Sequence, residues 1–141
     1  MSGLLLKFGC YQLIFGLFLA WIMVLTAHVK LSFLQKIIKS YRDLVKAHLD
    51  YFLMSLFLFS FFCLSRTLEF EPNFGATVLI LYGTSVNPLG FLIPALNPKV
   101  DSYSMTSFYK LLIGSAFLAT TSGICWFIFQ ALSRASSFSS V

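Results

Sequence analysis

Four runs of apolar residues dominate this sequence, and each is long enough to cross a membrane. A helix needs roughly 20 residues to span a hydrocarbon core of about 30 Å. The runs cover about residues 9–27, 47–65, 74–96 and 108–132 of the 141-residue chain. Only 11% of the residues are charged, which is too few to cover the surface of a soluble domain. We therefore expect a single all-α domain over residues 1–141, a four-transmembrane-helix bundle in contact with the lipid bilayer.

The first run has a competing interpretation as a secretory signal peptide. A signal has a short apolar core and ends in a small-residue cleavage site. This run is long and ends in Leu25-Thr26-Ala27-His28. We therefore expect it to be retained as a span.

A basic stretch with helical periodicity lies between the first two runs. From Val29 to Lys46, apolar residues recur every three or four positions and five Lys or Arg residues lie off that stripe. This pattern is typical of an amphipathic helix at a bilayer surface. Because no helix breaker follows, the pattern predicts one continuous helix that leads from this basic extension into the second span.

The basic residues also predict an orientation. Seven of the ten Lys and Arg residues, with Lys99 and Lys110 included, fall on the side that holds residues 28–46. The positive-inside rule then makes that loop cytoplasmic and turns both termini outward, as in a bacterial inner membrane protein. Nucleic-acid binding is the other use of such a stretch, but anionic lipid explains five charges on a surface helix, so we expect no nucleic acid.

The third and fourth runs contain residues that affect how helices continue and pack. Pro88 removes a backbone hydrogen bond and disfavours helix at Asn87. The freed backbone groups need partners inside lipid, so the break should face protein, water or a ligand. Asn87 then either satisfies backbone groups or donates to a substrate oxygen. Small residues between 114 and 123 suit packing against a neighbouring helix.

Two ionisable residues, His48 and Asp50, stand at the entrance to the second run. An ionisable side chain that enters lipid is costly unless it is bound, so it is by default a candidate site. Neutral imidazole is a common axial ligand of haem iron, so His48 is either a metal ligand or a packing or pH-responsive histidine. Asp50 either pairs with Lys46, four residues earlier, or orients a ligand or carries a proton.

Helical spacing predicts that His48 shares its face with aromatic and hydroxyl side chains. Tyr41, Phe52 and Phe59 are the expected walls of a site for a flat macrocycle, and Tyr51 and Ser55 supply two hydroxyl groups near it. His28, the other histidine, lies just outside a span and needs no special partner.

Several chemical classes lack their signatures in this sequence. It contains no His-x-x-x-His pair, no Gly-rich phosphate loop, no Cys-x-x-Cys and no serine nucleophile motif, which excludes soluble hydrolases and nucleotide-dependent enzymes. Cys10, Cys63 and Cys125 all fall in the outward halves of their spans. Lone cysteines in apolar spans usually act as small hydrophobes, so we assign no disulfide.

Two short segments resemble a known family. Ala47-His48-Leu49-Asp50 opens the second span and Gly83-Thr84-x-x-Asn87 lies in the third, as in the small membrane isomerases typified by styrene oxide isomerase and hydroxylaminobenzene mutase. The resemblance implies a homotrimer that holds haem b between subunits, with His48 as the axial ligand. It implies that Asp50 is the acidic residue of the mutase-like branch and that Asn87 is the polar residue of span three.

The same resemblance implies a reaction. Ferric haem would act as a Lewis acid on an oxygen of a small apolar substrate, either an epoxide that becomes an aldehyde or an aryl hydroxylamine that rearranges. Two positions depart from the family: Met54 stands where an asparagine is usual, and Leu92 lies where the epoxide branch has a tyrosine near the end of span three.

A rival interpretation comes from another functional class. The chain could be a non-catalytic membrane subunit, either an anchor in a larger complex or a haem-binding electron-transfer protein. A second axial ligand would favour electron transfer, and His28 and Met54 are the candidates for it.

Overall fold

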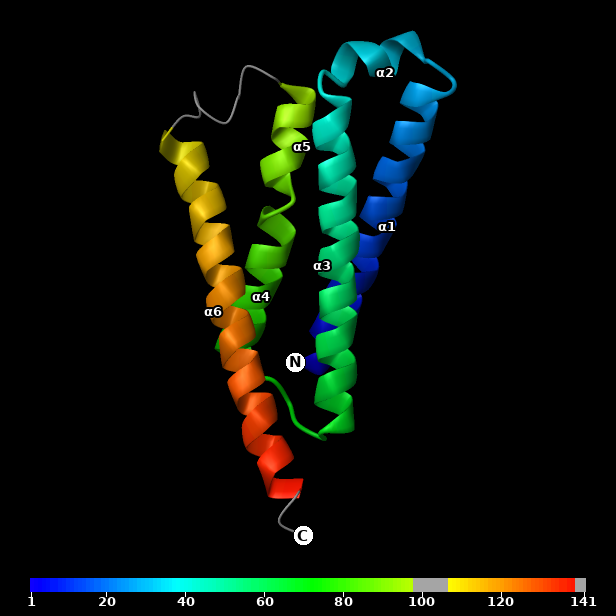
Figure 1. Ribbon diagram of the computed structural model, residues 1–141. Helices are drawn as coiled ribbons and strands as arrows, with labels where there is room; N and C mark the ends of the chain where they lie inside the picture. The colour runs from blue at the N-terminus through cyan, green and yellow to red at the C-terminus, as the bar shows by residue number, and fades with distance from the viewer. Residues whose placement is uncertain (98–106, 139–141) are drawn as a thin grey trace.

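The computed structural model describes residues 1–97 and 107–138, and every regular element there is a helix. The helices are α1 (Ser2–Ala27), α2 (Ser32–Ile37), α3 (Tyr41–Thr67), α4 (Phe74–Val86), α5 (Leu89–Leu96) and α6 (Ser107–Phe138) (Figure 1). Four stretches are long and apolar enough to cross a membrane: α1, α3, α4 together with α5, and α6 as far as Ser136. The predicted all-α four-helix bundle is confirmed.

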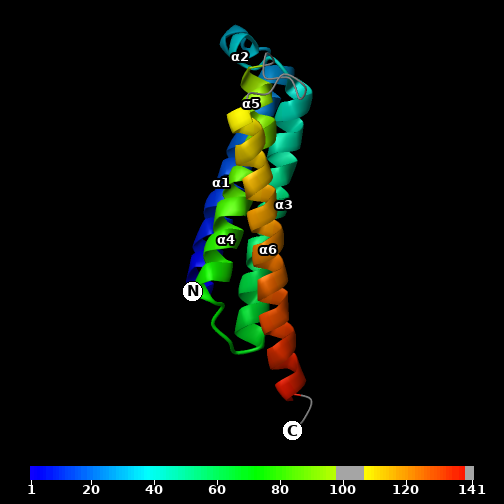
Figure 2. The same cartoon turned by 90° about the vertical axis from the view of Figure 1, so that its left-hand side faces the viewer.

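The long helices are arranged as two antiparallel pairs, α1 with α3 and α4 with α6 (Figure 1). Contacts between α3 and α5 join the pairs near the end that carries α2. The N-terminus and the described end of α6 lie toward the opposite end, as both views show (Figure 1, Figure 2). The second and third spans therefore meet where the third one breaks.

Glycines allow the closest helix approach, between α4 and α6. A Cβ atom on Gly83 would lie 2.7 Å from the amide nitrogen of Thr120, and one on Gly123 would lie 2.9 Å from the amide nitrogen of Ile80. Only a residue without a side chain fits such contacts. The expectation that small residues of the fourth span pack against a neighbour is thus confirmed for Gly123, whereas a Cβ on Gly114 would meet nothing within 4 Å.

The buried apolar residues form two clusters, one toward each end of the bundle. The cluster nearer the termini contains Leu5, Leu58, Phe61, Phe70, Ile80, Leu81, Phe127 and Ala131. The cluster nearer α2 contains Leu19, Ile38, Leu44, Ala47, Tyr51 and Ala95.

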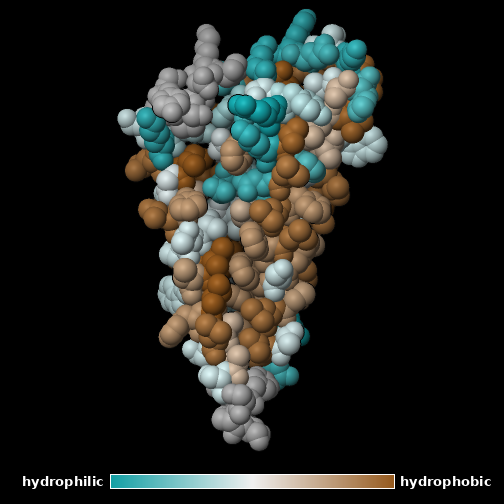
Figure 3. All heavy atoms as spheres, in the orientation of Figure 1, coloured by the Kyte–Doolittle hydropathy of each residue, from teal (hydrophilic) through white to brown (hydrophobic). Residues whose placement is uncertain are grey.

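Large apolar side chains also cover the outside of the bundle. Trp21 is 67% exposed, Phe117 64% and Phe129 70%. Figure 3 shows that hydrophobic residues cover the body of the molecule and that hydrophilic residues gather at the end that carries α2. Such a band is what contact with lipid requires, so the chain is a membrane protein.

The predicted continuous helix through residues 29–46 is wrong, because α2 and α3 are separate helices. Ile38 and Ser40 adopt extended backbone conformations between them. The amide groups of Lys39 and Ser40 both donate to the carbonyl oxygen of Ala95, at 2.8 and 3.1 Å. This tie to α5 replaces the helical hydrogen bonds that the extended segment lacks.

The physical reason for the new helix start is a cap at Ser40. Its hydroxyl oxygen accepts a hydrogen bond from the amide of Asp43, at 3.4 Å, and its hydroxyl group donates to the Asp43 carboxylate, at 2.6 Å. Serine is a favoured N-cap, and an acidic residue three positions later favours a helix start. The Ser-x-x-Asp signal overrides the continuous amphipathic pattern.

The predicted break in the third span is confirmed. The α4 helix ends at Val86, α5 begins at Leu89, and Asn87 and Pro88 form a turn between them. The break faces protein, as expected, because the Asn87 side chain contacts α3. Lys99, which contributes to the predicted orientation, lies outside the described residues.

Candidate functional site

Asp50 and Asn87, 37 positions apart, meet beside the break in the third span. The Asn87 side-chain nitrogen donates to Asp50 Oδ2 at 3.1 Å. Both side chains belong to half-buried residues. Two of the candidate residues predicted from the sequence are thus brought together, one from α3 and one from the turn between α4 and α5.

Lys46 does not pair with Asp50. Its ammonium group contacts Asp43 Oδ1 at 3.1 Å and lies 5.7 Å from the centre of the Phe91 ring. In residues 1–97 and 107–138, the ion pairs are this one and the pair between the Met1 ammonium group and Glu71. The ion-pair interpretation of Asp50 is therefore wrong, because the partner of its carboxylate is the neutral amide of Asn87.

His48 is oriented by the backbone of α1. Its Nδ1 lies 2.8 Å from the carbonyl oxygen of Gly16. A carbonyl oxygen can only accept, so Nδ1 carries the proton, and in the neutral ring Nε2 then has a free lone pair. A Cβ on Gly16 would lie 3.7 Å from the amide nitrogen of Phe52, so α1 and α3 run close together here.

His48 and Asp50 belong to two separate centres. Residues two positions apart on a helix point about 200° apart. Their contacts agree, because His48 reaches Gly16 of α1 and Asp50 reaches Asn87 on the other side of α3. A single chain therefore does not bring the imidazole and the carboxylate onto one face.

The aromatic residues expected around His48 are spread along α3. The Phe52 ring centre lies 6.5 Å from that of His48 with planes tilted by 38°, and Phe52 is partly exposed. Tyr41, at the first position of α3, is exposed. Phe59 packs near Gly9, where an added Cβ would lie 2.9 Å from its ring. Of these three rings, that of Phe52 is the one in contact with the His48 ring.

The two expected hydroxyl residues turn toward the bundle interior. Tyr51 is buried with its ring edge-on to Phe15, at 4.8 Å between centres. Ser55 is fully buried and donates to the carbonyl of Phe52 at 2.7 Å. Met54, one of the two departures from the family pattern, is buried as well.

Sequence reasoning missed a polar contact between α1 and α4. Gln12 is only 5% exposed, and its Nε2 donates to Thr84 Oγ1 at 3.2 Å and to Ser85 Oγ at 3.3 Å. The available signal was a glutamine in the middle of an apolar span, where an amide must find a partner.

Three polar contacts therefore connect α1, α3 and α4 pairwise, one between each two of the three helices. His48 joins α3 to α1, Gln12 joins α1 to α4, and Asn87 joins the end of α4 back to α3. In an apolar environment each of these groups needs its partner, so the three contacts together favour one relative position of the three helices.

An apolar cavity of about 270 Å³ lies beneath α2. Its lining consists of Phe15, Phe18, Leu19, Ile22, Leu34, Ile37, Ile38, Leu44, Leu92 and Leu96. Phe15 directly precedes Gly16, and Leu44 lies one helical turn before His48. The cavity therefore lies within about one helical turn of the His48 contact along α1 and α3, and His48 is not part of its wholly apolar lining.

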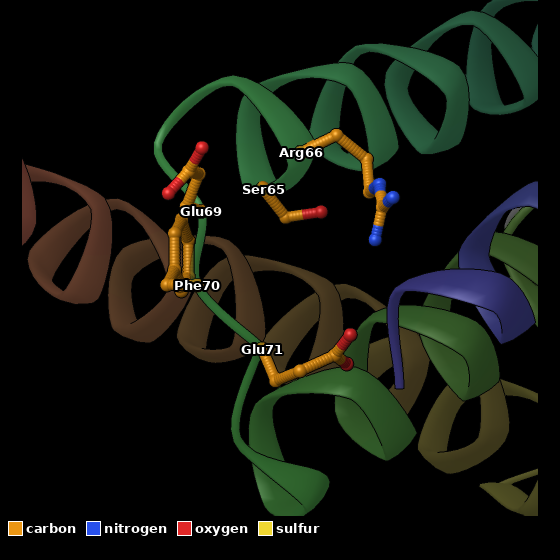
Figure 4. Close-up of a pocket in the computed structure, with 5 residues that line it drawn as sticks. All are labelled: Ser65, Arg66, Glu69, Phe70 and Glu71. Atoms are coloured by element: carbon orange, nitrogen blue, oxygen red, sulfur yellow. The ribbon is translucent and has the colours of Figure 1, made fainter.

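A second cavity, of about 350 Å³, lies at the opposite end and is polar. Ser65, Arg66, Glu69, Phe70 and Glu71 line it, and the side chains of Arg66 and Glu71 point into the same space (Figure 4). None of the candidate site residues predicted from the sequence lines this cavity.

Glu71 anchors the start of α1 at that end. Hydrogen bonds from the Met1 ammonium group, the Ser2 amide and the Ser2 hydroxyl lower the pKa of Glu71 to about 2. These contacts tie the loop before α4 to the first turn of α1.

The described residues hold no group of three or more His, Cys, Asp or Glu that could bind a metal ion, and Cys10, Cys63 and Cys125 are free. A haem requires one axial side chain rather than such a cluster. Comparisons with protein-family models, curated proteins and solved structures found no match to this chain.

Proposed function

We propose that this chain is a small integral-membrane isomerase that binds haem b through His48. The observation that carries the proposal is the hydrogen bond from Nδ1 to the Gly16 carbonyl, which leaves Nε2 as the free ligating atom. When bound, ferric haem supplies a Lewis acid for an oxygen of a small apolar substrate, an epoxide or an aryl hydroxylamine.

The residues present fit such a group. Histidines that bind metals usually donate their other ring nitrogen to a carbonyl or carboxylate, as His48 does. The neighbouring Phe52 is 39% exposed and His48 is half-buried, so the imidazole lies at the edge of the α1–α3 pair. A macrocycle there would lie against the side of the bundle, which supports binding between protomers of a homo-oligomer, a trimer if the family resemblance holds.

The distances to other ligands favour a single axial side chain. Met54 lies on the same helix about 9 Å further along the axis, and His28 lies about 18 Å along α1 from Gly16. Within one chain, neither can face His48 across one iron. His48 would therefore be the one side chain of its own chain to hold the haem, and a single protein ligand would favour catalysis over electron transfer.

The apolar cavity supports a small apolar substrate. Its 270 Å³ exceeds the roughly 150 Å³ of an engineered apolar cavity that binds benzene. Walls without hydrogen-bonding side chains disfavour water, and with lipid over its open side the cavity would protect a reactive intermediate from hydrolysis. Substrates of this kind dissolve in the bilayer and can enter sideways.

Asp50 and Asn87 form a second site in the proposed enzyme, where a proton can be held. Asn87 donates to one carboxylate oxygen of Asp50, which leaves the other oxygen to hold or accept a proton. Because His48 and Asp50 lie on opposite sides of α3, a substrate that contacts both would have to lie between two protomers. Tyr51 and Ser55 have supporting roles inside the bundle rather than at this centre.

The location of the chain is proposed from its charges. Lys30, Lys36 and Lys39 lie in or beside α2, next to Arg42 and Lys46 in the first turns of α3. This supports a cytoplasmic α2 and outward termini in a bacterial inner membrane. The test is a reporter enzyme that is active only outside the cytoplasm. Fused after Val141, it should be active.

The alternative is a non-catalytic membrane subunit or anchor. The contact between His48 and Gly16 is also what a purely structural histidine makes between two helices. Turnover separates the two functions: haem-loaded protein is incubated with a panel of small aryl epoxides and aryl hydroxylamines. We expect an isomer of one of them as product, and His48→Gln should abolish it. Absence of product across the panel from fully loaded protein would favour the subunit.

A further inference from the structure

Gln12 is a buried polar side chain that is only partly satisfied. Its nitrogen donates to Thr84 and Ser85, but its oxygen is buried and has no hydrogen-bond partner among the described residues. A buried acceptor without a partner costs about 1–3 kcal/mol. The structure therefore contains one acceptor that a bound group could satisfy.

Rotating the amide does not remove the problem. Amide oxygen and nitrogen are interchangeable in shape, and a rotated Gln12 would accept a hydrogen bond from the Ser85 hydroxyl, whereas the Thr84 hydroxyl already donates to the carbonyl oxygen of Leu81. The nitrogen would then be the buried atom without a partner. In either orientation one polar atom of Gln12 needs something that the bundle does not supply.

The surroundings of Gln12 are polar on three helices. Along α1, Gly9 meets Leu58 and Phe59, and Gly16 meets Tyr51. Since α1 and α3 are antiparallel, Gln12 lies level with the fully buried Ser55. The Ser55 hydroxyl proton is used in its own helix, but its oxygen can still accept.

Ser85 completes the set of donors and acceptors. Its oxygen accepts from Gln12 Nε2, so its hydroxyl proton remains available for donation. A free acceptor on Gln12 and a free donor on Ser85 fit a group that both donates and accepts one hydrogen bond. A hydroxyl group has this property. If the Gln12 amide is rotated, the Ser85 proton is used by Gln12, and the bound hydroxyl accepts from Gln12 Nε2 instead.

We propose that Gln12 and Ser85 form a binding site for a hydroxyl group inside the bundle, separate from the haem ligand His48. The hydroxyl donates to Gln12 Oε1 and accepts from Ser85 Oγ. Two sources share this chemistry, an internal water molecule and a small alcohol that enters from the lipid. A hydrocarbon of the same shape binds less tightly, because it gains no hydrogen bond from the Gln12 oxygen or the Ser85 hydroxyl.

The test observes the Gln12 side chain directly. The full chain contains three glutamines, Gln12, Gln35 and Gln130. Selective labelling of glutamine with ¹⁵N in nanodiscs gives three side-chain signals, and Gln35→Asn and Gln130→Asn assign Gln12 by elimination. The probes are water alone, benzyl alcohol, and toluene as the matched molecule without a hydroxyl group.

Two results support the site and identify its source. A cross-peak between the Gln12 amide and water, without any additive, indicates bound water. A saturable shift of the Gln12 signal with benzyl alcohol but not with toluene indicates an alcohol. Two results in the wild-type protein would overturn the proposal. One is a Gln12 signal with no water cross-peak and no shift with benzyl alcohol, and the other is a shift with toluene equal to that with benzyl alcohol.

Ser85→Ala tests the donor. It should remove the water cross-peak or weaken the apparent affinity for benzyl alcohol about tenfold, since that is the effect of losing one hydrogen bond of about 1.4 kcal/mol. Ser122→Ala is the matched control, because Ser122 is exposed and its hydroxyl bonds within α6. Equal behaviour of the two variants contradicts the proposed role of Ser85.

Discussion

The Asn87 side chain donates a hydrogen bond to the Asp50 carboxylate across 3.1 Å, and it does so from the turn that interrupts the third span. The break in the third span is therefore held against α3 by the Asp50 carboxylate. The turn that Pro88 imposes presents an amide to α3, and Asp50 has that amide, not Lys46, as its partner.

The first prediction concerns this pair. Asn87→Ala leaves the half-buried carboxylate without its donor and should lower the free energy of unfolding by about 1.5–3 kcal/mol, the usual range for a hydrogen bond to a charged group. Asp50→Asn is the control, since a neutral amide can still accept from Asn87. Thermal unfolding in detergent measures both. Equal loss in the two variants would argue against a specific bond.

The second prediction concerns the start of α3. Ser40→Ala removes the cap and should destabilise the protein by about 1 kcal/mol, with faster hydrogen exchange in the first turn after Tyr41. Ser60→Ala, whose hydroxyl bonds to a backbone carbonyl within the same helix, should change stability by less than about 0.5 kcal/mol. Unchanged exchange in Ser40→Ala would mean that the tie to Ala95 alone starts the helix.

The third prediction concerns the approach of α4 and α6. An added Cβ on Gly83 would collide with Thr120 Oγ1 and would lie 2.8 Å from the carbonyl oxygen of Ala116. Gly83→Ala should therefore cost about 1–3 kcal/mol or separate the helices. Gly114→Ala, where the space is open, should be neutral or stabilising by up to about 1 kcal/mol. Comparable stability of the two variants would contradict the packing described.

The fourth prediction concerns pH. The pKa of Glu71 is lowered from 4.5 to about 2, so its contacts with Met1 and Ser2 stabilise the folded state above pH 4.5 and are lost as the pH falls toward 2. The protection of the Ser2 amide against hydrogen exchange, relative to an unfolded amide at the same pH, should persist at pH 4 and fall only near pH 2. Glu71→Gln should exchange faster at neutral pH, whereas Glu69→Gln should not. Loss of protection already at pH 4–5 would contradict the lowered pKa.

Local signals predicted much of the fold but little of the pairing. Hydropathy and length predicted the spans, and Pro88 predicted the break. The Ser40 cap was also predictable from the Ser-x-x-Asp motif, but the amphipathic pattern that runs through it favoured one continuous helix instead. Lys46 had carboxylates both three residues before it and four residues after it, and the spacing rules allow either pair. Tertiary packing decided between them.

The candidate site was predictable only in part for the same reason. His48, Asp50 and Asn87 stand out as polar residues in apolar runs. The sequence does not show that the Gly16 carbonyl accepts a hydrogen bond from His48 or that Gln12 lies against Thr84, since these partners are 32 and 72 positions apart. Such contacts depend on which helices are neighbours and on their register.

The most direct test of the account is the visible spectrum of the purified protein after expression with ample haem. We predict a Soret band in the wild type that is lost in His48→Gln, a variant that keeps a donor for the Gly16 carbonyl but cannot ligate iron as imidazole does. His28→Gln and Met54→Leu should keep the band. A colourless wild-type protein, or an undiminished Soret band in His48→Gln, would contradict the assignment of His48 as the haem ligand.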